Sequence, residues 1–199
     1  MNVKPLYDES QFQGLYLKVN KFFQDRADIK KPRKSKNQSL AGGYLLNVGL
    51  REMGINPDNI KIDITKTGKP YILNDNIFFN IAHSEDFAVC AFGTSEIGVD
   101  IEKIKPLSER ILDKISLPSE RAKIYAAKQI VKLWTRKEAL SKCLGSGIGK
   151  HIFKTDLSEE QIRYDGMTYR LKSFELGEYM LSVCSEFDFP PEKIIEIRI

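Results

Sequence analysis

The chain has 199 residues, of which 42% are hydrophobic and 29% are charged, so it can bury a core and hold one domain or two small halves. No stretch is long and apolar enough to predict a membrane-spanning helix, and the first ten residues lack the basic-then-apolar order of a secretory signal. The three cysteines form no CxxC pair, which together with only two histidines argues against a zinc site. We therefore expect a cytoplasmic protein with reduced thiols, in which any metal is bound by oxygen atoms.

The first half of the chain predicts helices followed by short strands. Apolar residues at helical spacing predict one amphipathic helix over residues 9–23, and a second that Ser35 or Asn37 caps and that stops near Gly54. Alternating or continuous apolar runs then predict strands at residues 60–64, 77–82, 87–92 and 97–102, with a turn at residues 65–70.

The second half follows the same order. A polar segment with prolines, residues 103–119, precedes a helical pattern over residues 120–144. Strands are predicted at residues 169–174, 179–184 and 195–199. Each half thus consists of helices and a small, mostly antiparallel sheet, which is an α+β architecture. We place the two subdomains at residues 1–101 and 102–199.

The net charge of +4 is modest, and much of the positive charge falls in one early run, formed by Lys30, Lys31, Arg33, Lys34 and Lys36. Such a run is either a solvated loop or a contact for phosphate or another polyanion. Nucleic acid is a weaker alternative, because the run has no interleaved aromatic residues and no recognised binding motif.

The predicted strand IGVDIE contains two acidic residues on one face. Asp100 and Glu102 project together, while Ile97, Val99 and Ile101 point to the other face. Two neighbouring carboxylates repel each other, and a divalent cation between them relieves that repulsion. The pair is therefore a candidate magnesium site. The alternative is a half-exposed strand whose outer face is acidic.

The helical segment LWTRKEALSKCLG places Trp134, Glu138 and Lys142 on one face, at successive i, i+4 positions. By itself this is a stabilising Glu–Lys pair beside a core tryptophan. Combined with the two strand carboxylates, Glu138 offers a third oxygen ligand or a general base, and Lys142 offers a cation for phosphate.

Three further residues could contact an anion. His83 and Ser84, in NIAHS at a strand end, offer hydrogen-bond donors, although a lone histidine is more often an ordinary loop residue. Lys69 lies in the turn GKP, where a lysine is usually only solvated. Three carboxylates for a metal and several donors for phosphates together indicate phosphoryl chemistry on a polyphosphate substrate.

These segments resemble the Sfp-type 4'-phosphopantetheinyl transferases. That family has a strand of the form (I/V)G(I/V)D followed by xE, here IGVDIE, and a helix of the form WxxKEAxxK, here WTRKEALSK. The order GKPY, FFNIAHS and FAVCAF before IGVDIE also resembles the family, so that the similar stretch runs over residues 68–149. One departure is the pair Gln38-Ser39, where the commoner pattern has an arginine before threonine or serine.

The resemblance implies two pseudo-twofold-related subdomains with coenzyme A bound in the cleft between them. The N-terminal subdomain would contact the adenosine and phosphates, and the C-terminal one the metal and the carrier protein. Asp100, Glu102 and Glu138 would hold Mg²⁺, with Glu138 and Lys142 acting in catalysis. The residues implied to bind coenzyme A are Lys69, His83, Ser84, Lys142, Arg33 and Lys36.

The implied activity is transfer of the 4'-phosphopantetheine arm of coenzyme A, the substrate, to a serine of an apo acyl or peptidyl carrier protein, releasing 3',5'-adenosine bisphosphate. Residues 103–129 would face the carrier, with Arg110, Lys114, Arg121 and Lys123 available to dock its acidic surface. We expect no nucleic-acid or membrane partner, and a monomer, since one chain supplies both sides of the cleft. The alternative is a protein that binds coenzyme A and transfers nothing.

Overall fold

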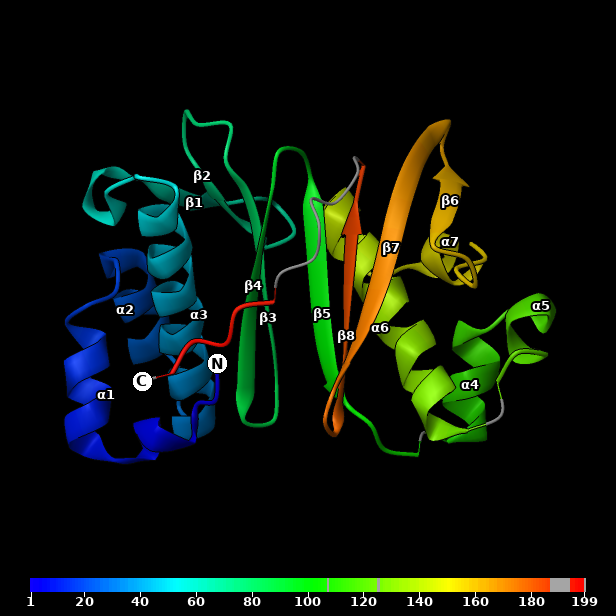
Figure 1. Cartoon of the computed structure of the whole chain (residues 1–199), viewed down its shortest axis with the longest axis horizontal. Helices are drawn as coiled ribbons and strands as arrows, with labels where there is room; N and C mark the ends of the chain where they lie inside the picture. The colour runs from blue at the N-terminus through cyan, green and yellow to red at the C-terminus, as the bar shows by residue number, and fades with distance from the viewer. Residues whose placement is uncertain (107, 125, 187–193, 199) are drawn as a thin grey trace.

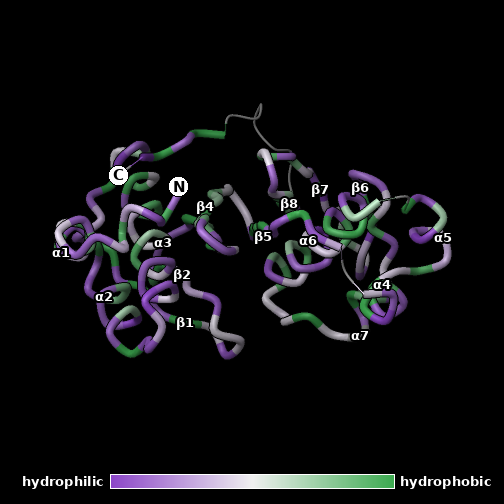
Figure 2. Tube along the Cα trace, turned by 90° about the horizontal axis from the view of Figure 1, so that it is seen from below, coloured by the Kyte–Doolittle hydropathy of each residue, from purple (hydrophilic) through white to green (hydrophobic). Residues whose placement is uncertain are grey.

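The computed structural model describes residues 1–106, 108–124, 126–186 and 194–198. It confirms an α+β fold of small antiparallel sheets with packed helices. The strands lie in the middle of the molecule, with helices α1–α3 at one end and α4–α6 toward the other (Figure 1). The view from below shows the same arrangement, with β4 and β5 between the two groups of helices (Figure 2).

Three α-helices form most of the N-terminal end. After a short 3-10 helix, Lys4–Tyr7, they are α1 (Glu9–Tyr16), α2 (Lys21–Asp28) and α3 (Arg33–Glu52). The single helix expected over residues 9–23 is therefore wrong. The break occurs at Asn20, whose side-chain oxygen accepts a hydrogen bond from the amide of Phe22 at 3.0 Å and caps α2. Asparagine favours this cap position over a helix interior.

Gly42 and Gly43 lie inside α3 without breaking it. A Cβ on Gly42 would lie 2.8 Å from a side-chain carbon of Ile81, and one on Gly43 would lie 2.5 Å from the ring of Phe23. The two glycines therefore allow α3 to pack closely against β3 on one side and α2 on the other.

The strands of the described residues form three antiparallel sheets. Strands β1 (Ile62–Ile64) and β2 (Pro70–Ile72), which follow the 3-10 helix Pro57–Asn59, make a small hairpin, and β3 (Phe78–Ser84) pairs with β4 (Phe87–Gly93). The third sheet has the order β5-β8-β7-β6. Its strands are β5 (Ile97–Lys103), β6 (Gln161–Tyr164), β7 (Met167–Leu176) and β8 (Tyr179–Ser185). The short strands β2 and β6 were not predicted from the sequence.

The C-terminal helices are α4 (Glu109–Ile115), α5 (Pro118–Arg121), α6 (Ala127–Leu144) and α7 (Lys150–Phe153). The continuous helix expected over residues 120–144 is thus two helices. The apolar spacing does not show this break, because Ile124, which precedes α6, packs against the same cluster as Ile130 and Trp134 of α6.

The strand expected at residues 195–199 is not formed within residues 194–198, and residue 199 lies outside the described residues. Ile197 packs against the N-terminal core, while Ile195 is exposed. The alternation of apolar and polar residues here therefore reflects the packing of Ile197, and no strand among the described residues pairs with this segment. No helix of the described residues is both long and apolar enough to cross a membrane.

The buried residues fall into three clusters. One is built from residues 1–88 and a second from residues 115–184, while a third joins Ala82 to Val99, Ile101, Tyr179 and Leu181. This agrees with two packed halves, but their pseudo-twofold relation and the boundary at 101/102 stay predictions. That boundary falls inside β5, which pairs with β8 along its whole length.

Candidate functional site

The site begins where helix α6 crosses strand β5. A Cβ on Gly98 would lie 2.0 Å from the carbonyl oxygen of Ala139 and 2.4 Å from the amide nitrogen of Cys143. Only glycine allows this approach, because both neighbours are backbone atoms. Gly98 shares its face of β5 with Asp100, so the close contact brings Lys142 of α6 beside that carboxylate.

Asp100 is buried, with 5% of its surface exposed. Lys142 Nζ donates to its Oδ1 at 2.6 Å, while Oδ2 is buried and has no hydrogen-bond partner among the described residues. Burial, with a smaller contribution from the charges of Glu138 and Glu102, raises the pKa of Asp100 to about 7 against the opposing effect of Lys142. The interpretation of this strand as one with an exposed acidic face is therefore wrong.

Glu102 and Glu138 both act on Asp100 through their negative charges. Burial, followed by the negative charge of Glu102, raises the pKa of Glu138, while Lys142 lowers it. Glu102 Oε2 accepts a hydrogen bond from Ser84 Oγ at 2.7 Å. Three mutually repelling carboxylates and one unpartnered buried oxygen are a donor set that suits a hard cation. No group of three such side chains within the described residues is arranged as a complete metal site, however.

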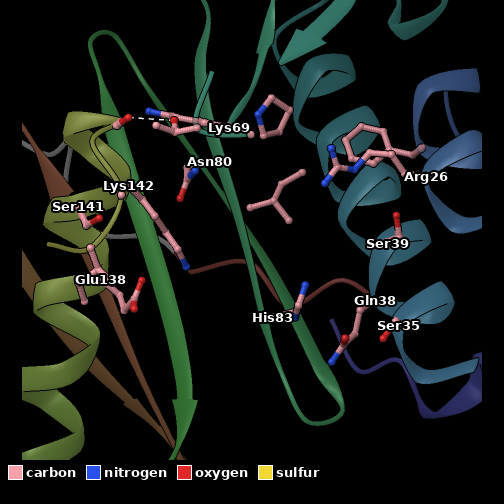
Figure 3. Close-up of a pocket in the computed structure, with 18 of the residues that line it drawn as sticks. Arg26, Ser35, Gln38, Ser39, Lys69, Asn80, His83, Glu138, Ser141 and Lys142 are labelled. Carbon is pink, nitrogen blue, oxygen red and sulfur yellow. Dashed lines mark hydrogen bonds between the residues drawn. The ribbon is translucent and has the colours of Figure 1, made fainter. Parts of the chain in front are cut away.

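A pocket of about 380 Å³ is lined by Glu138 but not by Asp100 or Glu102, and both halves of the chain contribute to its lining. Glu138, Ser141 and Lys142 of α6 form one wall, and Figure 3 shows Arg26, Ser35, Gln38 and Ser39 on the opposite side, with Asn80 and His83 of β3 between them. The basic groups that line it are Arg26, Lys30, Lys69, His83 and Lys142. Such a wall suits a ligand with several anionic groups.

Comparison with known proteins gives these residues a context. The family model of the 4'-phosphopantetheinyl transferase superfamily matches residues 96–184, which include β5 and α6. The chain is 35% identical to the 4'-phosphopantetheinyl transferase HetI of Nostoc sp. over 127 residues, 57% of this chain and 50% of that protein. It is 27% identical to the 4'-phosphopantetheinyl transferase Sfp of Bacillus subtilis over 176 residues, 78% of this chain and 77% of that protein.

Residues 96–184 thus match the 4'-phosphopantetheinyl transferase superfamily, and the chain is similar to proteins of that name over a wider stretch. The resemblance to the Sfp-type members that the sequence motifs indicated is confirmed. The chain spans about half the length of HetI and 54% of another transferase of Bacillus subtilis, to which it is 32% identical.

Several residues predicted for the superfamily's site lie at the pocket. Lys69, His83, Glu138 and Lys142 line it. Lys69 also forms an ion pair with Glu96 at 2.6 Å, and its ammonium group donates to the carbonyl oxygen of Ile97. Removal from bulk water, followed by the positive charge of Lys142, lowers the pKa of His83, so the imidazole tends to be neutral and can donate one hydrogen bond.

Other predicted residues lie elsewhere. Arg33 faces α1, where it forms an ion pair with Glu9 at 2.7 Å, donates to the carbonyl oxygen of Leu6, and lies over the ring of Phe12. Arg33 and Lys36 do not line the pocket. Ser84 is buried against Glu102 and also lies outside the lining.

Arg26 and Asn80 line the pocket but were not predicted as site residues. Asn80 Oδ1 accepts a hydrogen bond from the amide of Val99 at 2.9 Å, which fixes β3 beside β5. A signal for Arg26 existed in the sequence. Arg26 follows Phe23 at i+3, on the side of α2 that the apolar Phe23 turns inward.

Proposed function

We propose that this chain transfers the 4'-phosphopantetheine arm of coenzyme A to a serine of an acyl or peptidyl carrier protein, releasing 3',5'-adenosine bisphosphate. The observation that supports it most directly is that Glu138 and Lys142 line one basic pocket, where Lys142 also contacts the buried carboxylate of Asp100. The relatives' names agree with this activity, since each is a 4'-phosphopantetheinyl transferase.

The pocket suits the phosphate-bearing part of coenzyme A. Its volume falls within the range of about 300–1,000 Å³ that small-molecule sites occupy. Arg26 and Lys30 line the pocket from α2 and the residues just after it, Lys69 from the turn between β1 and β2, and Lys142 from α6 of the other half. Basic groups on two sides can bind a diphosphate and a separate phosphate of one ligand at the same time.

We assign Asp100, Glu102 and Glu138 to Mg²⁺. The buried, unpartnered Oδ2 of Asp100 and the mutual repulsion of the three carboxylates fit such an ion. When bound, magnesium would neutralise the negative charge of the phosphate oxygens and make the phosphorus more electrophilic. Lys142, which contacts Asp100, would then be available to place its positive charge against the 5'-phosphate of the leaving 3',5'-adenosine bisphosphate.

The carrier serine hydroxyl would attack the β-phosphorus of coenzyme A as the bond to the bridging oxygen breaks. Its proton needs an acceptor, and Glu138 faces the pocket with a raised pKa that suits proton transfer. A carboxylate that shares its charge with a cation is a weaker base. We therefore assign Glu138 to the metal first, and to the proton directly or through a water molecule second.

The alternatives have less support. A protein that only binds coenzyme A has no need of Asp100 and Glu138 together with Lys142. The basic run that suggested nucleic acid is partly engaged in the fold, since Arg33 pairs with Glu9 and Lys34 pairs with Glu85. We propose a monomer because one chain lines the pocket from both sides, and the cytoplasmic location stays a prediction.

The test is to mix the purified chain with Mg²⁺, coenzyme A and an apo carrier protein, and to measure the mass of the carrier. Addition of one phosphopantetheine, lost in Asp100→Ala and Lys142→Ala, is the expected result. Lys21→Ala is the matched control, because Lys21 lies on α2 in an exposed pair with Asp25 and should leave transfer intact. No addition to any of several carriers would overturn the proposal.

A further inference from the structure

Glu85 occupies a turn position that normally suits glycine. It lies in the two-residue connection between β3 and β4, after the last paired residues Ser84 and Phe87. Its φ of 46° is in the left-handed region. Among the described residues, the other non-glycine residues with positive φ are Asn74 and Asp165, and asparagine and aspartate tolerate this region better than glutamate.

Helix α3 holds this turn through two side chains that lie one helical turn apart. Lys34 Nζ forms an ion pair with Glu85 Oε2 at 2.5 Å, and Gln38 Nε2 donates to the carbonyl oxygen of Glu85 at 2.8 Å. Gln38 is buried. The helix therefore fixes both the side chain and the backbone of Glu85, which explains how the unfavourable conformation persists.

The residue before Glu85 contacts the proposed metal site. Ser84 is buried and donates its Oγ hydrogen to Glu102 Oε2 at 2.7 Å. This contact spans from β3 to β5, two strands that belong to different sheets. The direction of the Ser84 side chain depends on how the turn is held at Glu85, because the two residues are joined by one peptide unit.

We propose that Glu85 is a positioning residue for the Glu102 carboxylate. Helix α3 fixes the turn through Lys34 and Gln38, the turn aims Ser84 at Glu102, and Ser84 presents the carboxylate in one orientation to a divalent cation. The inference rests on the proposed metal site. It makes no use of the transfer step. Hydrogen bonds to a ligating carboxylate typically contribute about 10- to 100-fold to metal affinity.

The test measures binding of Mn²⁺ alone to the full chain by electron paramagnetic resonance, with Asp100→Ala as the variant that lacks the site. Glu85→Gly removes the ion pair and makes the positive φ favourable, so we expect an unchanged or higher unfolding midpoint and about tenfold weaker Mn²⁺ binding. Asp165→Gly is the matched control. It relieves the same kind of conformation, at φ 49°, in the distant turn between β6 and β7, and should leave Mn²⁺ binding unchanged.

Two further variants test whether Glu85 affects Mn²⁺ binding through Ser84 and through its ion pair with Lys34. Ser84→Ala should weaken Mn²⁺ binding by the same factor as Glu85→Gly, and the double variant should lose no more than either single one, because both changes act through one hydrogen bond. Lys34→Met breaks the ion pair without changing the turn residue, so it should also weaken binding.

Wild-type affinity in both Glu85→Gly and Lys34→Met, or a double variant whose loss is the product of the single losses, would overturn the inference. A wild-type chain that binds no Mn²⁺, or that binds it equally well with Asp100→Ala, overturns the metal site and the inference with it. A chain that binds Mn²⁺ through Asp100 and transfers nothing contradicts the proposed transfer, and in that chain the Glu85 comparison still decides the inference.

Discussion

Gly98 of β5 and Ala139 of α6 meet through their backbones. A Cβ at position 98 would lie 2.0 Å from the carbonyl oxygen of Ala139, and neither atom could rotate aside. This contact sets the distance between the helix and the strand. It thereby allows Lys142 Nζ to contact Asp100 Oδ1 at 2.6 Å.

Gly98→Ala should push α6 away from β5. We expect a loss of about 1–3 kcal/mol in the free energy of unfolding, measured with urea, as for other overpacked cores. Transfer activity, measured where the variant is still folded, should fall further, because Lys142 and Glu138 move with the helix. Gly14→Ala is the control, since nothing lies within 4 Å of a Cβ at that helical position. A Gly98→Ala variant as stable as the wild type would contradict the packing argument.

The sequence indicated which side chains share a face, but not how the two faces meet. Asp100, Glu102, Glu138 and Lys142 were selected as candidates because spacing on a strand and on a helix fixes which side chains share a face. The meeting of the two faces depends on Gly98, whose role is a contact between segments 41 residues apart, and no local pattern shows such a contact.

The errors have the same origin. Arg33 and Lys36 of the basic run were assigned to the ligand, but the first turn of α3 points Arg33 toward Glu9 and Phe12, while Arg26 of the preceding helix lines the pocket. Charge alone does not show which side of a helix a residue occupies. The broken helix over residues 9–23 depended on Asn20 acting as a cap, a choice that apolar spacing does not show.

Arg26→Ala and Arg33→Ala form a matched pair, because both remove an arginine from the N-terminal helices. If Arg26 contacts a phosphate of coenzyme A, its loss should raise the KM for coenzyme A about tenfold or more, with kcat little changed. Arg33 lies outside the pocket, so its variant should keep the wild-type KM and lose only stability. Steady-state kinetics with a saturating carrier protein measures both. Equal KM values for the two variants would remove Arg26 from the ligand site.

Lys137 and Glu120 form a fully buried ion pair at 2.8 Å, one residue before Glu138. Glu120 also accepts hydrogen bonds from the amides of Leu117 and Leu157, so it joins α5 to α6 and to the loop after α7. Lys137→Met should therefore cost about 3–5 kcal/mol of unfolding free energy, since it leaves a buried carboxylate without its cation. Adding Glu120→Gln should restore part of this loss. Urea unfolding of the single and double variants is the measurement, and additive losses would contradict the pairing.

The raised pKa of Asp100 makes a prediction for the pH dependence of stability. Burial raises the pKa from 3.8 to about 7, so between these values the folded chain holds a proton that the unfolded chain has released. The contribution of Asp100 to stability is thus fully present below about pH 4, and it falls as the pH rises toward 7, by up to about 1.4 kcal/mol per pH unit. Above pH 7 the loss is complete.

Asp100→Asn should remove this part of the pH dependence, because an amide does not titrate. Urea unfolding from pH 4 to pH 8, in the presence of a metal chelator, should therefore show the wild type losing stability relative to the variant. Mg²⁺ should stabilise the wild type more at pH 8 than at pH 5, since the cation competes with the proton for the same carboxylate. A wild type and an Asp100→Asn variant with parallel pH profiles would show that Asp100 keeps an ordinary pKa. In that case the charge of the carboxylate would already be balanced within the fold, by Lys142.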